Sequence, residues 1–289
     1  MNLPSRTSRM RLPVSPLAGR PAPESLLADG PANHRNSAQP LKILVVDVGG
    51  THVKCAGTDH ADPQQFPSGP RMTPAQMVKQ VLKLTRTWRF DAVSIGYPGV
   101  VARGQPVRNP QNLGRGWVGF DFAAAFGRPV RIHNDAAMQA LGNYAGGKML
   151  FLGLGTGLGS TLIVDGVVVP MELAHLQWRK GRDYEHYVGD RARKRLGEKK
   201  WRAKVKQVVY DFRNALQPDE IVLGGGNARR LKHLPPSTRL GDDLAAFRGG
   251  LRLWDDRARR DGMHARSPDP VAKAKSSNGR RKAPARTPH

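Results

Sequence analysis

The sequence predicts an α/β fold made of two similar lobes, and three observations support this prediction. First, an apolar run at residues 43–46 predicts a buried strand, which ends in Asp47 and the turn Gly49-Gly50. Second, another apolar strand at residues 149–152 also runs into a glycine-rich turn. Third, residues 73–88 place apolar side chains at helical spacing between the two strands. Two strand-and-turn units separated by a helix indicate a duplicated architecture.

The helix expected at residues 73–88 carries its own start signal. Thr73 is the expected N-cap, and Pro74 takes the first helical position, where its missing N–H removes no helical hydrogen bond. The apolar face consists of Met77, Val81, Leu84 and Trp88. We expect this face to cover a sheet.

Composition divides the chain of 289 residues into a folded body and two tails. Residues 1–40 are rich in Pro, Ser, Ala and Arg without periodicity, and residues 257–289 end in a basic, low-complexity segment. Both segments predict disordered tails. Within the body we expect an N-terminal lobe over residues 41–133 and a C-terminal lobe over residues 134–256.

The chain is strongly basic, with a formal net charge of +24. The excess is present in the body as well as in the tails, so we expect attraction to polyanions: nucleic acid, anionic lipid or chains of phosphate. Aromatic residues are few and no basic-aromatic module is present, which argues against specific nucleic-acid binding. No apolar run approaches the roughly 20 residues that cross a bilayer, so no membrane association is expected.

Cys55 is the single cysteine. It can form neither an intramolecular disulfide nor a thiolate zinc cluster, so no zinc is expected and the cytoplasm is the expected compartment. The N-terminus lacks the continuous apolar segment of a secretory signal.

The first glycine turn has the composition of a phosphate site. Two residues without Cβ let an anionic oxygen approach several backbone N–H groups at once. Neither the nucleotide-binding Gly-Lys-Ser/Thr ending nor a following helix is present, so an ordinary Asp-Gly hairpin turn remains an alternative. The residues expected to contact a phosphoryl donor here are Asp47, Gly49, Gly50, Thr51 and Lys54.

The segment at residues 109–117 concentrates amides, glycines and one aromatic side chain. Amides such as Asn112 both donate and accept hydrogen bonds, and the face of Trp117 could pack on a sugar ring. This composition predicts a ligand-binding loop, with an ordinary surface turn as the alternative.

A strand at residues 130–133 runs directly into Asn134-Asp135 and an alanine-rich helix. An aspartate at a helix start can be only a cap. Junctions of this kind are also where ligands bind in α/β sheets, and the helix N-terminus favours an ionised carboxylate. With an ordinary pKa near 4, Asp135 could still accept a hydroxyl proton late in phosphoryl transfer.

Two further glycine turns are expected to hold the donor. The glycines of residues 153–160 are too dense for a normal strand and predict a second phosphate-binding turn, including Gly155, Thr156, Gly157 and Gly159. A third turn, residues 224–226, follows a strand and is expected to precede a helix. Its glycines, Gly224, Gly225 and Gly226, could seat a base and ribose.

Six ordered motifs resemble the ROK group of sugar kinases, and within it the polyphosphate glucokinases. They are DVGGT at 47–51, GYPGVV at 96–101, Asn-Asp at 134–135, LGTGLGS at 154–160, DGVVVPMELAHL at 165–176 and IVLGGG at 221–226. The resemblance covers the body and neither tail. It implies the duplicated actin-like, ribonuclease-H-like fold, with sugar and phosphoryl donor meeting in a cleft between the lobes.

The resemblance also implies roles for individual residues. Asp135 corresponds to the catalytic base, and Glu172 and His175 correspond to sugar-binding residues; Glu185 is the best match for a further sugar-binding glutamate. Together with Asn112 and Asn134, they form the expected substrate site. Taken alone, His175 could equally be a surface or core histidine.

Two features depart from the usual family pattern. Met171 and Ala174 stand where the family motif has glycines, which leaves the choice of sugar open. The zinc-binding cysteines of many ROK kinases are missing, as they are in the polyphosphate-type relatives.

The expected reaction is transfer of a terminal phosphoryl group to a hexose hydroxyl, O6 of glucose being the expected acceptor. We expect Mg²⁺ to bridge the donor oxygens under the influence of Asp47. The donor is polyphosphate, ATP or both. Residues 177–206 hold 12 Lys or Arg against 4 acids, and this basic run could extend a polyphosphate site or be only a solvated helix face.

Two other functions remain open at this point. One is an ATP-dependent kinase of another hexose. The other is a non-catalytic sugar sensor, although the sensors of this group carry a helix-turn-helix that the proline-rich first 40 residues are not expected to form. The sequence also leaves the oligomeric state open, a homodimer included.

Overall fold

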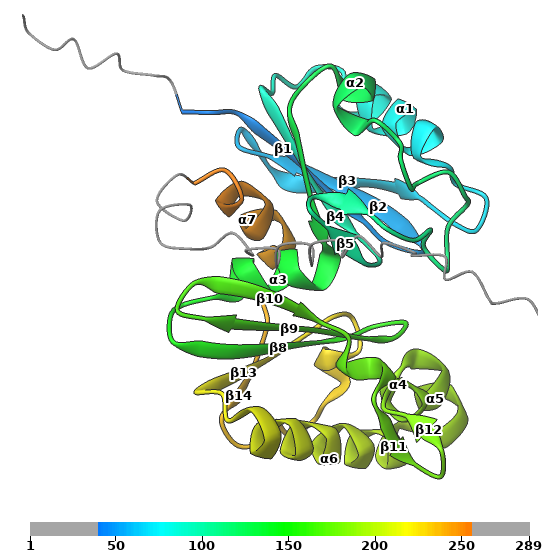
Figure 1. Ribbon diagram of the computed structural model, residues 1–289, viewed down its shortest axis with the longest axis vertical. Helices are drawn as coiled ribbons and strands as arrows, with labels where there is room; N and C mark the ends of the chain where they lie inside the picture. Colours follow the sequence, from blue (N-terminus) through cyan, green and yellow to red (C-terminus); the bar gives the residue numbers. More distant parts are fainter. Residues whose placement is uncertain (1–39, 256–289) are drawn as a thin grey trace, which may run out of the picture. The chain divides into compact units, whose positions relative to one another are not determined.

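The computed structural model describes residues 40–255, and these residues contain two five-stranded sheets (Figure 1). The expected tails lie outside this range, apart from Pro40. The first sheet has the order β3-β2-β1-β4-β7. Its strands are β1 Ile43–Val48, β2 His52–Gly57, β3 His60–Pro67, β4 Ala92–Tyr97 and β7 Val130–Asn134.

The second sheet repeats this topology, with the order β10-β9-β8-β13-β14. Its strands are β8 Lys148–Leu154, β9 Leu158–Val164, β10 Val167–Met171, β13 Glu220–Gly224 and β14 Thr238–Leu240. In both sheets three consecutive strands pair antiparallel, and two later strands add parallel to the first of them. The predicted duplication is confirmed.

Helices and short strands complete the described chain. The helices are α1 Pro74–Leu84, α2 Phe122–Phe126, α3 Asp135–Asn143, α4 Glu185–Val188, α5 Asp190–Leu196, α6 Glu198–Leu216 and α7 Ala245–Arg252, with 3-10 turns η1 Leu173–His175 and η2 Ala228–Arg230. The short strands are β5 Val101–Ala102, β6 Gln105–Pro106, β11 Gln177–Arg179 and β12 Arg182–Asp183. Across residues 40–255, no helix combines the length and apolar character that a bilayer crossing requires.

The start of α1 is confirmed, but its end is earlier than expected. Thr73 and Gln76 form a reciprocal capping box. The helix ends at Leu84 because Thr85 leaves helical geometry, its hydroxyl donating to the carbonyl of Val81 at 2.9 Å. Trp88 therefore packs from the following turn, where it stacks on His60.

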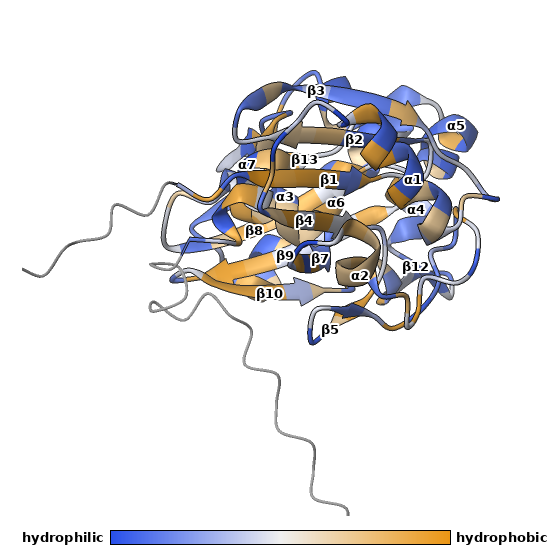
Figure 2. Ribbon diagram, turned by 90° about the horizontal axis from the view of Figure 1, so that it is seen from above, coloured by the Kyte–Doolittle hydropathy of each residue, from blue (hydrophilic) through white to orange (hydrophobic). Residues whose placement is uncertain are grey.

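The central strands alternate between two cores, which explains why they are apolar on both faces. In β1, Leu44 and Val46 belong to the core beneath α1, whereas Val45 packs with α3 and α7. In β8, Leu150 packs toward α6 and Phe151 toward α3. Figure 2 shows the same apolar character along β1, β4, β8 and β9.

The spacing of apolar residues between positions 205 and 216 predicts that the helix after the basic run buries one side, and the structure confirms this. Four of its side chains lie in the core of the second sheet: Val205, Val208, Val209 and Phe212. Leu216 is only partly buried and packs at the edge of this core. Trp201 is fully buried, and its indole nitrogen donates to the carbonyl of Val188 at 2.8 Å.

Helix α7 joins the end of the described chain to its beginning. A Cβ on Gly249 would lie 1.8 Å from the carbonyl oxygen of Met138, so only glycine permits α7 to pack this closely on α3. Ser94 of β4 donates to the carbonyl of Gly250 at 2.7 Å and accepts from the Trp254 indole at 2.8 Å. The end of the segment assigned by sequence to the second lobe thus packs on the first sheet.

Candidate active site

The glycine turns and the start of α3 surround a cavity of about 450 Å³. Its walls come from segments that are far apart in the chain. The predicted residues that line it are Gly49, Gly50, Thr51, Asn112, Asn134, Asp135, Gly155, Thr156, Gly157, Gly159, Glu172, His175, Glu185, Gly225 and Gly226. We call it the sugar cavity, after the ligand that the sequence motifs lead us to expect there.

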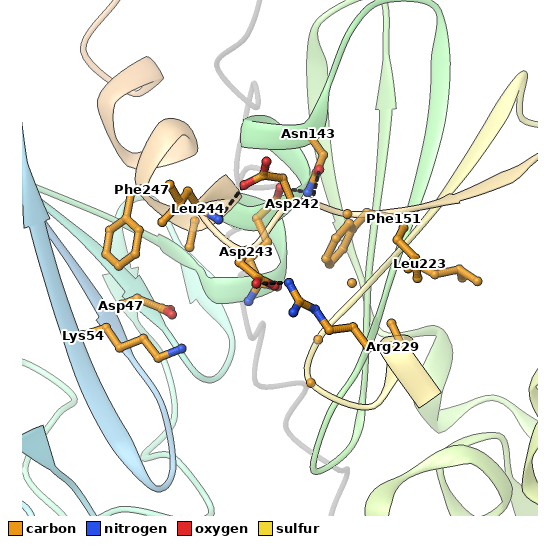
Figure 3. Close-up of a pocket in the computed structure, with 18 of the residues that line it drawn as sticks. Asp47, Lys54, Asn143, Phe151, Leu223, Arg229, Asp242, Asp243, Leu244 and Phe247 are labelled. Carbon is orange, nitrogen blue, oxygen red and sulfur yellow. Dashed lines mark hydrogen bonds and ion pairs between the residues drawn. The ribbon is translucent and has the colours of Figure 1, made fainter. Parts of the chain in front are cut away.

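A second cavity of about 580 Å³ adjoins the first (Figure 3). The two share Gln139, Phe151, Gly225 and Gly226 as lining residues. The remaining predicted residues, Asp47, Lys54 and Gly224, line this second space, which we call the donor cavity. The structure therefore brings every residue predicted for the site, except Trp117, to one of two adjoining cavities.

Asp135 is the first residue of α3, but it is not the helix cap. The cap is Asn134, whose side-chain oxygen accepts from the N–H of Ala137 at 3.1 Å. The Asn134 amide also donates to the carbonyl of Gly99 at 3.1 Å, which fixes the β7–α3 junction against the Gly96–Gly99 turn. The interpretation of Asp135 as only a cap is wrong, and its carboxylate is left to face the sugar cavity.

The pKa of Asp135 differs from the expected value near 4. Burial, with the charge of Asp47 added to it, raises this pKa to about 7, although the N–H of Ala136 donates to the carboxylate at 2.8 Å. Burial likewise raises the pKa of Asp47 to about 6, against the opposing effect of Lys54. Desolvation outweighs the helix N-terminus here. A carboxylate with a pKa near neutrality is suited to general-base work.

The first glycine turn is closed by backbone and hydroxyl groups. Gly49 donates to the carbonyl of His52 at 2.9 Å, and its own carbonyl accepts from the Ser68 hydroxyl at 2.6 Å. A Cβ on Gly49 would lie 2.7 Å from the His52 oxygen, so the turn requires glycine. Gly50 lies against Asn112, which brings the amide-rich loop to the same wall.

The amide-rich loop contains one expectation that is wrong. Trp117 is fully buried among Tyr97 and Phe122 and does not line the sugar cavity, so its ring cannot stack on a sugar there. The loop bends inward because the Asn109 side chain accepts from the N–H groups of Gly116 and Trp117, at 3.1 and 3.0 Å.

The second glycine turn is shorter than expected. Gly153 and Gly159 pair with each other in the β8–β9 ladder, so only residues 155–157 form the turn. Gly159 does not form part of the turn but allows close packing. A Cβ on Gly159 would lie 2.9 Å from the Cβ of Ala136 at the start of α3. Gly159 thus brings the second sheet against the helix that carries Asp135.

Glu185 packs directly on the second turn. Its carboxylate accepts from the N–H of Leu158 at 3.2 Å, and a Cβ on Gly157 would lie 2.1 Å from the same oxygen. On the other side of the turn, the Asn227 amide donates to the carbonyl of Gly155 at 3.2 Å. Sequence reasoning missed Asn227, although it follows the third glycine turn directly.

Glu172 and His175 lie together at the rim of the sugar cavity. The Glu172 carboxylate is 3.6 Å from Nε2 of His175, and the carboxylate of Asp183 is 3.8 Å from Nδ1. Both His175 and Glu172 are more than half exposed, so the core alternative for His175 is wrong. Asp183 was not predicted because only the β11–β12 hairpin returns it to this position.

A buried hydroxyl holds the segment that carries Glu172. Ser160 donates to the carbonyl of Met171 at 2.8 Å and accepts from the N–H of Leu173 at 3.1 Å. It lies at the end of the LGTGLGS motif, but its partners come from later in the chain, so local sequence gives no signal for this role.

The third glycine turn precedes a single 3-10 turn, η2, and not the expected helix. Gly225 has φ +78, and a Cβ there would lie 2.5 Å from the carbonyl oxygen of Leu154. The backbone is thereby held against the second turn. The N–H of Asn227 donates to the same Leu154 carbonyl at 2.9 Å. The third turn is therefore bonded to the end of β8 and is not followed by an α-helix.

Three cations of the basic run form ion pairs with acids of the same run. Arg193 pairs with Asp190 at 2.8 Å and with Glu198 at 2.9 Å, and Lys194 and Arg202 pair with the same two acids. Arg191 and Arg195 are exposed and line a third cavity of about 330 Å³ beside Thr156 and Glu185. Lys199 and Lys200 are exposed as well.

The sequence is similar to a known protein family and to individual related enzymes. Residues 43–170 match the sequence profile of the ROK family. A polyphosphate glucokinase of Mycobacterium tuberculosis (strain ATCC 25618 / H37Rv) is 31% identical over 214 residues, covering 64% of this chain and 77% of that protein. The polyphosphate glucokinase of Mycobacterium leprae (strain TN) is 28% identical over 235 residues, covering 73% of this chain and 69% of that protein.

Solved structures share the same architecture. The inorganic polyphosphate/ATP-glucomannokinase from Arthrobacter sp. strain KM matches with a TM-score of 0.64 and 24% identity, over 74% of this chain and 98% of that chain. A ROK family glucokinase from Streptomyces griseus matches with a TM-score of 0.59 and 17% identity, over 73% and 98%. The repeated sheets are those of the actin-like sugar kinases. The chain belongs to the ROK family.

Proposed function

We propose that the protein is a phosphotransferase that moves the terminal phosphoryl group of polyphosphate or ATP to a hexose hydroxyl, with O6 of glucose as the acceptor. The observation that carries this proposal is the position of Asp135, a carboxylate of raised pKa that lines the sugar cavity at the start of α3. The names of the related enzymes support the choice of acceptor and donor.

Asp135 is the general base in this proposal. The hydroxyl oxygen attacks the terminal phosphorus, a new O–P bond forms, and the bond from phosphorus to the bridging oxygen of the donor breaks. The hydroxyl proton passes to Asp135, and the leaving group is ADP or a polyphosphate shortened by one unit. Backbone N–H groups of the first two glycine turns stabilise the charge on the transferred group.

Sugar recognition falls to the groups around the sugar cavity. Glu172, His175 and Glu185 hydrogen-bond the remaining hydroxyls, with Asn112 on the opposite wall. Asn134 also positions the start of α3, because its side-chain oxygen accepts from Ala137 and its amide nitrogen donates to Gly99. Its second N–H and second lone pair are left for a sugar hydroxyl.

Phosphoryl transfer normally uses Mg²⁺, and the donor cavity fits such an ion. Asp47 is a carboxylate whose pKa is raised by burial, with Lys54 as the cation that opposes this shift. A divalent cation beside Asp47 would stabilise the ionised carboxylate that burial disfavours. Asp47 would therefore hold Mg²⁺ directly or through water. When bound, Mg²⁺ neutralises charge on the donor oxygens.

The donor chain runs from the turns toward residues 224–226 in this proposal. A nucleotide would place its ribose and base against the third glycine turn, which lines the donor cavity together with Phe151 and Leu223. A polyphosphate would follow the same path with phosphates alone.

One assay tests the proposal. Purified protein is given glucose with Mg²⁺ and either ATP or long-chain polyphosphate, and glucose 6-phosphate is measured, with mannose and fructose as comparison acceptors. Phosphorylation of glucose that Asp135→Asn abolishes supports the proposal. Glucose binding by calorimetry without turnover on either donor would contradict it and favour a sugar sensor.

A further inference from the structure

Acidic residues outnumber basic residues in the lining of the donor cavity, although the chain as a whole is strongly basic. Its ionisable lining residues are Asp47, Lys54, Arg229, Asp242 and Asp243. Two cations thus face three carboxylates in a space that is proposed to receive a polyanion. Donor binding there depends on how these few charges are paired.

Arg229 and Asp243 form an ion pair with each other across this cavity (Figure 3). Arg229 lies on η2, directly after the third glycine turn, and Asp243 lies on the loop that leads into α7. Their side chains are 65% and 66% exposed, so the pair lies at the solvent-facing rim. Exposed pairs contribute little to stability and exchange partners readily.

The other charged groups of the cavity already have neighbours or proposed roles of their own. Asp242 accepts from the N–H of Leu244 at 2.7 Å and pairs with Arg248 at 3.2 Å. Asp47 and Lys54 are cross-strand neighbours on β1 and β2. At the solvent-facing rim of the donor cavity, Arg229 is therefore the cation that can meet a donor phosphate, and Asp243 is the carboxylate that pairs with it.

We propose that the Arg229–Asp243 pair selects the phosphoryl donor, and this inference rests on the proposed function. A donor phosphate displaces Asp243 and takes the Arg229 guanidinium, which binds phosphate in a fork of two N–H groups. The released Asp243 carboxylate then repels any negatively charged group that follows this phosphate in the donor. An uncharged ribose tolerates this carboxylate and can donate a hydroxyl to it, whereas a polyphosphate continues with another negative charge. Asp243 thereby favours a nucleotide over a phosphate chain.

The chain offers a matched control for Arg229. The neighbouring Arg230 does not line the donor cavity; its side chain pairs with Glu198 at 3.4 Å and its carbonyl accepts from Arg202 at 2.6 Å. Arg230→Gln removes the same charge from the same turn without touching the proposed donor path.

The test measures KM for ATP and long-chain polyphosphate in Asp243→Asn, Arg229→Gln, the double variant and Arg230→Gln. We expect Asp243→Asn to lower the polyphosphate KM roughly 3- to 10-fold and to leave or slightly raise the ATP KM. Arg229→Gln should raise both by about 5-fold or more, and the Asp243→Asn gain for polyphosphate should persist in the double variant, because Asp243 repels the phosphate chain whether or not Arg229 is present. Arg230→Gln should match wild type.

Equilibrium binding separates this inference from the proposed function. Calorimetry with Mg²⁺ and either the non-hydrolysable ATP analogue AMPPNP or tripolyphosphate reports donor choice without turnover. If wild-type protein transfers phosphate but Asp243→Asn leaves the ratio of the two donors unchanged, the inference is overturned and the function stands. If no transfer occurs yet the calorimetric ratio shifts as expected, the function fails and the selection stands. Failure to bind either probe overturns both.

Discussion

The two glycine turns occupy equivalent places in the two sheets, but different chemistry holds them. The first turn is closed by neutral groups, with the Ser68 hydroxyl donating to the carbonyl of Gly49. The second turn is held by a carboxylate, since Glu185 accepts from the N–H of Leu158. Glu185 also lines the sugar cavity. The second turn is therefore held by an acidic side chain of the sugar cavity, whereas the first turn contacts the neutral side chain of Asn112.

The two halves of the duplicated fold thus contribute different residues to the cleft. The topology of the two sheets is the same, so the contrast comes from what is inserted after each antiparallel unit. In the second lobe the insertion carries η1, the β11–β12 hairpin and α4, and these deliver His175, Asp183 and Glu185 to the cleft. The first lobe supplies Asp47 and the junction that presents Asp135.

Asp135 lies where the two halves meet, and its removal should have the largest effect. Asp135→Asn keeps the shape but removes the base, so we expect turnover to fall by at least about 10²-fold while sugar affinity changes little. Steady-state kinetics and glucose binding by calorimetry measure the two quantities. A variant that keeps more than about half of wild-type turnover would remove Asp135 from the mechanism.

The second-lobe side chains should affect the acceptor and not the donor. Glu172→Gln and His175→Ala each remove a hydrogen bond to a desolvated hydroxyl, and we expect the sugar KM to rise about 10-fold in each. The donor KM, measured at saturating sugar, serves as the internal control. A raised donor KM with unchanged sugar binding would place this pair in the donor site.

Matched glycine substitutions test the comparison of the turns directly. Gly157→Ala meets the end of a flexible side chain, Glu185, so we expect an intact fold with a sugar KM raised several-fold. Gly49→Ala meets the backbone oxygen of His52, which cannot yield as easily, so we expect a loss of about 1–3 kcal/mol of stability. Denaturant unfolding and sugar KM are measured for both. Equal effects of the two variants would show that the turns are not differently braced.

The basic helices should give a smaller, salt-dependent effect. Arg193 and Arg202 are committed to ion pairs, so the exposed Arg191, Arg195, Lys199 and Lys200 are the ones to change to Gln. If they meet polyphosphate, the slope of log affinity against log salt should flatten by roughly 0.7 for each phosphate-binding cation that is removed, with ATP unaffected.

The control for this experiment carries Lys79→Gln and Lys83→Gln on α1, which belongs to the other lobe. A slope that is the same in wild type, the four-residue variant and this control would make the basic run only a solvated helix face.

The raised pKa of Asp135 predicts a pH-dependent stability. The folded protein keeps this proton up to about pH 7, whereas the unfolded chain releases it near pH 4, so ionisation costs stability as pH rises through that window. Asp135→Asn should therefore melt above wild type at pH 8, by roughly 2–4 °C for each kcal/mol relieved. Calorimetric melting from pH 4 to pH 8 should show the difference closing toward pH 4. A constant difference across this range would contradict the raised pKa.

Several features were predictable because their cause is local. The apolar runs that become β1 and β8, the N-cap at Thr73, and the buried face of α6 depend on spacing within a few residues. Six ordered motifs were enough to indicate the family. The residues of the site could be named from those motifs, but not the contacts that they make.

The predictions that failed depended on neighbours that are distant in the chain. Trp117 turned inward because Tyr97 and Phe122 offered an apolar site. Gly153 and Gly159 pair in the ladder, and Gly159 lets the ladder pack on α3, where a side chain would not fit. In each case the local composition favoured an exposed loop or turn, whereas packing against residues distant in the chain placed the residue in a core or a strand.

The amino-acid sequence alone was sufficient for the duplicated α/β pattern, the family and many of the residues that line the cleft. It took the folded chain to establish that Glu185 presses on Gly157, that Asp183 reaches His175, and that Arg229 faces Asp243. Strand and helix patterns follow from interactions between near neighbours, whereas the pKa of a carboxylate and the partner of an arginine depend on burial and on charges that folding brings together.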